Sequence, residues 1–109
     1  MQLLLVVLHR EELLDDVLSA LVELELPDAV VLESRTSLEL LERDLPIFAG
    51  IRSLIPGGID FSRLVLCIVE DDRLADQVLA EVRALGGGLP SGEPQNTAFL
   101  VPITDVIHF

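Results

Sequence analysis

The sequence predicts an α+β domain in which helices pack on one face of an antiparallel sheet. Its 109 residues are enough for one domain with a single two-layer core. Half of the residues are hydrophobic and only 4% are aromatic, so leucine, valine and isoleucine must form this core. Apolar runs typical of strands also alternate with segments of helical periodicity.

The first third of the chain predicts a strand, a helix and a second strand. Residues 2–8, QLLLVVL, are continuously apolar, as in a strand that is central in a sheet or buried on both faces. Residues 11–26 place apolar side chains on one helical face and carboxylates on the other, and Pro27 ends this helix. Residues 29–34, AVVLES, predict the second strand.

The region from 36 to 60 is less regular. The segment SLELLERD is compatible with a short helix, and Pro46 interrupts the pattern that follows. IFAGIRSLI is compatible with another turn or two before Pro-Gly-Gly at 56–58. We therefore expect a long insert between two strands.

The second half repeats the order of the first. Residues 63–70, RLVLCIVE, predict a third strand, and a second amphipathic helix follows with Asp71 or Asp72 as its N-cap and Gly86 as its C-cap. TAFLVPITDVIHF, residues 97–109, predicts a last strand, which Pro102 bends or places partly at an edge.

Two βαβ halves of similar length predict a ferredoxin-like split βαβ plan (βαββαβ) within one domain that spans residues 1–109. The 36–60 insert and a glycine-rich loop at 86–96 interrupt it. The sheet face without helices is still apolar and needs a cover. We therefore expect a trimer or a dimer.

The charge pattern excludes several classes of function. The net charge is −12, and all seven basic residues are scattered arginines. Binding to nucleic acid or to anionic membranes requires clustered cations, so neither partner is expected. The chain has no lysine and therefore no P-loop lysine.

The apolar runs and the single cysteine indicate where the protein works. No apolar run approaches the roughly 18 to 20 residues that span a bilayer, and LLLVVL at 3–8 lacks the flanks of a signal peptide. No membrane insertion is expected, and the surplus apolar residues are assigned to a subunit interface. Cys67 alone cannot form an intrachain disulfide, which fits a cytoplasmic location.

The histidines and the cysteine do not predict a catalytic or a metal site. His9 and His108 follow adjacent antiparallel strands at opposite ends, roughly 20 Å apart. They are interpreted as solvated histidines, with a site shared between subunits as the alternative. Cys67 lies in the middle of a strand, where a buried apolar role is favoured over a nucleophile.

The acidic pairs Asp15–Asp16 and Asp71–Asp72 do not form a carboxylate dyad, because neighbouring helix positions diverge by about 100°. No Ser/His/Asp set, zinc-ligand spacing or Walker motif occurs in the sequence. We expect no enzyme activity, no catalytic residue, no metal site and no cofactor.

The segment 43–58, RDLPIFAGIRSLIPGG, is the most distinctive stretch of the chain. One interpretation is a packing role, either as an arm between subunits or as a lid over the domain's own sheet. The other is a docking loop for a partner protein. In the docking interpretation Phe48 and Ile51 are the anchors around Arg52. Loops of this length are uncommon unless they pack or carry a function.

The apolar first strand, LLDDVLSALVE, AVVLESR, RLVLCIVEDDRLADQVLAEV and NTAFLVPITDVI together resemble the nitrogen-regulatory PII signal-transduction family, especially its divergent PII-like branch. The resemblance runs from Leu3 to Ile107 as a distributed pattern. It implies a cytoplasmic ferredoxin-like homotrimer that senses adenine nucleotides or other small effectors in clefts between subunits. Such proteins dock onto transporters or enzymes.

Several ligand contacts that the resemblance implies have no counterpart. Where the family has a Gly-x-Gly pair and a basic residue, this chain reads Thr36 to Glu39, and a glutamate there repels phosphate. The family's phosphate-binding lysine aligns with Thr97 and one family arginine with His108. Backbone amides of the glycine loop GGGLPSG, 86–92, remain a possible anion nest. Classical ATP or ADP sensing is not expected.

The predicted function is a PII-like trimer that binds a small, less charged effector, a protein partner through the insert, or both. The alternatives are a structural trimer module without a ligand and a small metal-handling protein. The candidate ligand-binding residues are Ser34, Arg35, Thr36, Gly86, Gly87, Gly88, Gly92, Asn96 and Thr97.

Overall fold

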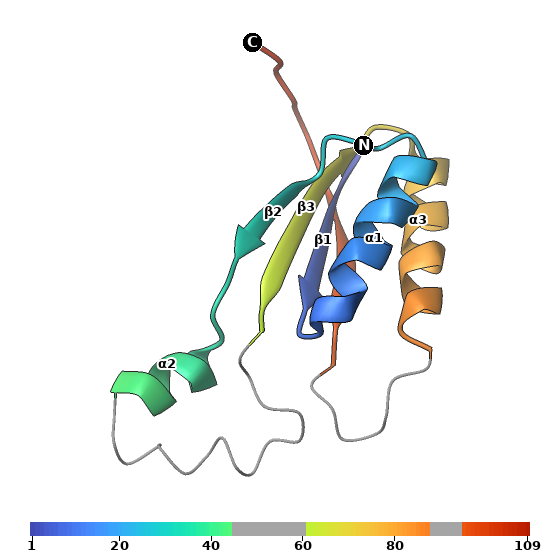
Figure 1. Ribbon diagram of the computed structural model, residues 1–109. Helices are drawn as coiled ribbons and strands as arrows, with labels where there is room; N and C mark the ends of the chain where they lie inside the picture. Colours follow the sequence, from blue (N-terminus) through green and yellow to red (C-terminus); the bar gives the residue numbers. More distant parts are fainter. Residues whose placement is uncertain (45–60, 88–94) are drawn as a thin grey trace.

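A computed structural model describes residues 1–44, 61–87 and 95–109 of the chain (Figure 1). In these residues four strands and three helices follow one another in the order β1, α1, β2, α2, β3, α3, β4. Their bounds are β1 Gln2–Leu8, α1 Glu11–Glu23, β2 Val30–Glu33, α2 Ser37–Asp44, β3 Arg63–Val69, α3 Asp72–Leu85 and β4 Thr97–Pro102.

The four strands form one antiparallel sheet in the order β2-β3-β1-β4. Helices α1 and α3 lie side by side on the same face of this sheet (Figure 1). Each βαβ half places its two strands apart, so that a strand of the other half inserts between them. This is the ferredoxin-like βαββαβ arrangement, and the predicted fold class is confirmed.

The hydrophobic core lies between the sheet and these two helices. It forms because alternate residues of the strands and one stripe of each helix are apolar and point toward each other. The buried apolar side chains are Leu4, Val6, Leu8, Leu13, Val17, Leu21, Val65, Cys67, Val69, Ala75 and Val78.

The two long helices end in different ways. Helix α1 was expected to reach residue 26, and this was wrong, because Glu25 adopts a left-handed backbone with φ 64°. The Leu26 amide then donates to the Leu21 carbonyl at 2.8 Å, which closes the helix. Pro27 therefore follows the end of α1 and does not itself cause it.

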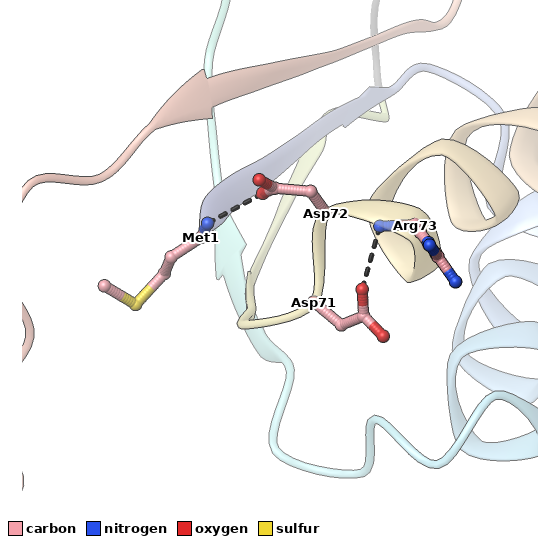
Figure 2. Close-up of polar contacts among 4 residues, drawn as sticks. All are labelled: Met1, Asp71, Asp72 and Arg73. Atoms are coloured by element: carbon pink, nitrogen blue, oxygen red, sulfur yellow. Dashed lines mark hydrogen bonds and ion pairs between the residues drawn. The ribbon is translucent and has the colours of Figure 1, made fainter.

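Helix α3 begins at a side-chain cap, as the sequence predicted. The Arg73 amide donates to Asp71 Oδ1 at 2.9 Å, and Gly86 is the C-cap (Figure 2). The amino group of Met1 lies 2.7 Å from Asp72 Oδ1, which joins the start of β1 to the first turn of α3 (Figure 2). This contact lowers the pKa of Asp72, because the hydrogen bond and the positive charge of the amine both favour the carboxylate.

Strand β4 is shorter than the predicted strand 97–109 and ends at Pro102. The reason is its partner: Pro102 pairs with Gln2, and the Ile103 amide donates to the Met1 carbonyl at 3.1 Å. The register between β1 and β4 ends with these contacts. Residues 104–109 run away from the sheet as a single extended strand-like trace (Figure 1).

The short helix expected within the 36–60 insert is present as α2, which lies beyond the end of β2 and apart from α1 and α3 (Figure 1). Pro46 and residues 47–58 lie outside the described residues, so the predictions made for them stay predictions.

Candidate functional site

A polar pocket lies at the base of the insert, where the chain leaves β2 and returns into β3. Its volume is about 430 Å³, and it is lined by Glu33, Ser34, Arg35, Glu39 and Arg63. We call it the stem pocket. The first four residues belong to the outgoing stem of the insert, whereas Arg63 belongs to the returning stem.

The sheet register places Arg63 in the stem pocket. Arg63 is the first residue of β3 and pairs across the strands with Glu33, the last residue of β2. Its guanidinium lies 3.5 Å from Glu33 Oε1, donates to the Ser62 carbonyl at 2.9 Å, and stacks 4.5 Å from the centre of the Phe61 ring. The guanidinium is therefore held in one position before any ligand arrives.

A pair of hydroxyl groups fastens the two stems together. Ser34 Oγ lies 2.6 Å from Ser62 Oγ, and the Ser34 amide donates to the Ser62 carbonyl at 3.2 Å. Ser62 is only 3% exposed, so its polar groups are satisfied by Ser34 and by Arg63. Ser34 thus contributes to the pocket wall from a rigid position.

Thr36 has a structural role at the start of α2. Its Oγ1 accepts a hydrogen bond from the Glu39 amide at 3.2 Å, and its carbonyl accepts from the Leu40 amide at 3.1 Å. This is the geometry of an N-cap. Thr36 was predicted as a ligand contact, but in the described residues it holds the first turn of the helix and does not line the pocket.

Glu39 brings an unsatisfied group into the stem pocket. Its Oε2 is buried and has no hydrogen-bond partner among the described residues. Two carboxylates, Glu33 and Glu39, face two guanidiniums, Arg35 and Arg63, so the formal charge of the lining is balanced. A ligand with several phosphates would meet both repelling carboxylates. The pocket suits a small polar ligand of low charge, and a ligand N–H group could satisfy Glu39 Oε2.

Asn96 and Thr97 lie at the same end of the sheet as the stem pocket but at the opposite edge, at the start of β4. Glu33 and Thr97 mark this end on β2 and β4, and β3 and β1 lie between them. Three strand spacings separate the two positions by about 14 Å. One chain therefore does not assemble the stem pocket and the 96–97 residues into a single site.

Asn96 connects β4 to the end of β1. Its Oδ1 accepts a hydrogen bond from the His9 amide at 2.8 Å, whereas its Nδ2 is buried without a partner among the described residues. The Oδ1 contact gives Asn96 a structural role. Because Nδ2 is buried as well, the structure gives no support to Asn96 as a ligand contact within one chain.

The described glycines of the glycine-rich loop do not need to be glycine. Gly86 caps α3 with φ −87°, which any residue adopts. A Cβ on Gly87 would lie 3.5 Å from the Ala84 carbonyl oxygen, an ordinary contact. Gly88 and Gly92 lie outside the described residues, as do the predicted partner-binding residues Phe48, Ile51 and Arg52.

The cysteine and the histidines do not converge on a site. Cys67 is buried, and this burial, followed by the charge of Asp28, raises the pKa of its thiol. His108 Nε2 lies 3.7 Å from Glu70 Oε1, beyond the end of the sheet opposite to His9. The parts of the chain that the structure describes contain no group of three or more residues suited to hold a metal ion.

The sheet face opposite α1 and α3, which no described helix covers, is the second feature of functional interest (Figure 1). By the strand register it carries only apolar side chains and Thr97, with no charged group on the described strands. We call this surface the open face. Its apolar residues are Leu3, Leu5, Val7, Val30, Leu32, Leu64, Leu66, Ile68, Phe99 and Val101.

The chain matches no protein-family model and no curated protein sequence. None of the described helices is long and apolar enough to cross a membrane. The site therefore has to be judged on its own geometry.

Reasoning from sequence missed Arg63 and Glu33 as site residues. The pattern that could have identified them is the pairing of AVVLES with RLVLCIVE as neighbouring strands. The pairing brings the last residue of one strand opposite the first of the next and places their opposite charges at the insert's base.

Proposed function

We propose that this chain is a PII-like regulatory protein that works in the cytoplasm as a homotrimer and binds a small effector at the stem pocket. The observation that carries the proposal is the composition of this pocket. Its lining comes from both stems of the insert, so a ligand that contacts Arg35 and Arg63 bridges the outgoing and the returning chain. Ligand binding then biases the arrangement of the insert, which meets a partner protein.

The lining favours an effector of low charge over a nucleotide triphosphate. Arg63 already shares its guanidinium with Glu33, and Glu39 adds a second carboxylate. One anionic or carbonyl group on the ligand is enough to engage Arg35 and Arg63. Further negative charge would face Glu33 and Glu39 across the same small volume.

A thermal-shift screen tests the proposal. The purified protein is heated with adenine nucleotides, cyclic dinucleotides, 2-oxoglutarate and bicarbonate. A specific ligand at 100 times its Kd adds about 2.7 kcal/mol to the free energy of unfolding, which is a clear rise in Tm. Arg35→Gln should abolish this rise.

Arg83→Gln is the matched control, because it removes the same charge in the last turn of α3, away from the pocket. The proposal predicts that the rise in Tm survives in this variant. A second readout is hydrogen exchange of the insert, which should change when the ligand saturates the pocket. The proposal is overturned if Arg35→Gln and Arg83→Gln lose the rise in Tm equally. It is also overturned if no bound ligand changes the hydrogen exchange of the insert.

The open face supports a second candidate, a structural trimer module without a ligand. Ten apolar side chains lie on this face, on which the described strands place no charged residue, and such a surface is typical of a subunit interface. Deleting residues 44–58 separates the two candidates. Loss of the trimer favours the structural module, whereas an intact trimer favours an insert that docks a partner.

A further inference from the structure

Strand β2 forms one edge of the sheet among the described strands. It pairs only with β3, and its outer side faces no other strand in the described residues. Its apolar side chains are far from buried: Val30 is 53% exposed, Val31 38% and Leu32 45%. Lysine, proline or a bulge often prevents further pairing at an edge, and Val30–Glu33 has none of these; the strand is short, at four residues, and its one charged side chain is Glu33 at its end.

Residues 104–109, which we call the arm, are the second element without a place in the fold. The arm leaves β4 after the last hydrogen bond to Met1 and points away from the sheet (Figure 1). Ile107 is 79% exposed and Phe109 is fully exposed. The arm is extended in shape (Figure 1), and three of its six residues, Val106, Ile107 and Phe109, are apolar. His108 Nε2 lies 3.7 Å from Glu70 Oε1.

The arm cannot pair with the sheet of its own chain. Strand β1 is occupied on both sides by β3 and β4, and the arm continues directly from β4. The free edge of its own β2 lies across three strand spacings, about 14 Å away, and the arm runs past the end of the sheet (Figure 1). A second copy of the chain offers the same β2 edge without this constraint.

We propose that the arm of one protomer adds as an extra strand to the free edge of β2 in a neighbouring copy. Six extended residues span about 20 Å, which is enough to follow the four residues of β2, about 13 Å. The backbone groups of β2 that lack a strand partner would gain hydrogen bonds from the arm, as in other cases of strand addition.

The side chains of the arm match the two faces of β2. In an extended arm Asp105, Ile107 and Phe109 lie on one side, and Thr104, Val106 and His108 lie on the other. With Ile107 beside Leu32, the first side continues the open face that Val30 and Leu32 begin. With the arm antiparallel to β2, Phe109 lies beside Val30 and Asp105 falls past the end of the strand. On the second side His108 then meets Val31, and Val106 meets Glu33.

This inference rests on the self-association that we propose above, and it names the segment that joins the copies. An arm that runs from each protomer to the next is a head-to-tail contact, which closes into a ring when the rotation between copies allows it. A trimer is one such ring. The arm also extends each sheet, so the open faces of successive copies become parts of one surface.

Crosslinking between separately labelled chains tests the arm directly. In a Cys67→Ser background, one sample carries Ile107→Cys and a second carries Leu32→Cys, and the two are mixed before a short bismaleimide is added. The proposal predicts covalent dimers that contain one chain of each kind. Asp16→Cys on exposed α1 replaces Leu32→Cys as the control and should give at least tenfold less of this product.

A second measurement keeps the test independent of the cysteine variants. Deleting residues 104–109 leaves every strand and the bond between Ile103 and Met1 intact. Hydrogen exchange in Val30–Glu33 should be at least tenfold slower in the full chain than in the deletion, when both are measured at high concentration.

The outcomes separate this inference from the proposed function. An oligomer that gives neither the mixed crosslink nor slower exchange in β2 overturns the arm and leaves the trimer standing. A full chain that stays monomeric at every concentration overturns both. Crosslinking and arm-dependent slow exchange together support the arm.

Discussion

On strand β1 the two faces of the sheet carry the same kinds of apolar side chain from Leu3 to Leu8 and have opposite surroundings. On β1, Leu4, Val6 and Leu8 are at most 1% exposed beneath α1 and α3, whereas Leu3, Leu5 and Val7 alternate with them on the open face and remain partly exposed. The helices complete one core, and nothing in the described residues completes the other. The comparison teaches that an apolar run in a central strand is typical of packing on both faces, and the described residues supply a partner for one of them.

The largest expected effect distinguishes the two faces at neighbouring positions. Leu4→Ala removes a side chain that is 0% exposed and should lower the free energy of unfolding by about 2–5 kcal/mol. Leu5→Ala, one residue along on the open face, should lose less than half of this in dilute protein. Urea unfolding at low protein concentration measures both, and equal losses would mean that the open face is as well packed as the core.

The cap of α3 tests the helix layer alone. Asp71→Ala removes the acceptor of the Arg73 amide and should lower the free energy of unfolding by about 1 kcal/mol. Asp71→Asn, which keeps a capping oxygen, should recover most of this loss. Because the cap lies away from the open face, the association of the protein should not change in either variant.

The end of α1 offers a stabilising change in the same layer. Glu25 holds φ 64°, a backbone conformation that costs an L-residue roughly 1 kcal/mol and glycine almost nothing. Glu25→Gly should therefore raise the free energy of unfolding by somewhat less than this amount. Glu25→Ala keeps the penalty and serves as the control; an equal gain from both variants would contradict the backbone explanation.

Cysteine labelling compares the faces at adjacent positions of β3. Burial raises the pKa of the Cys67 thiol, so at pH 8 it should react with iodoacetamide far more slowly than a free thiol. A cysteine at position 66, introduced by Leu66→Cys, lies on the open face and should react quickly in dilute protein. It should become protected as the concentration rises, whereas the labelling of Cys67 should not depend on concentration.

The same raised pKa sets a small pH dependence with a defined sign. The stabilising contribution of protonated Cys67 is fully present below the pKa of an unfolded thiol, about 8.5, and is lost as the pH rises through the higher pKa of the folded state. Cys67→Ala should remove this alkaline loss of stability. The comparison is made by urea unfolding between pH 7 and pH 10.

The sequence predicted the sheet, the helices and their order because each element carries a local pattern of apolar residues. It overestimated β4, since the end of that strand depends on its register with β1, which is not a local property. It also overestimated α1, because a left-handed Glu25 has no distinctive local pattern. For the site, Ser34 and Arg35 were predicted, but Arg63 joins them only through the register between β2 and β3.

The most direct test of the account is the mass of the protein in solution, measured by light scattering during size-exclusion chromatography over a wide concentration range. Wild type should approach three times the 11.9 kDa of one chain. Leu66→Asp, which places a charge at the centre of the open face, should run as a folded monomer with unchanged helical content. A wild-type protein that remains at 11.9 kDa throughout, or a Leu66→Asp variant that still forms a trimer, would contradict the account.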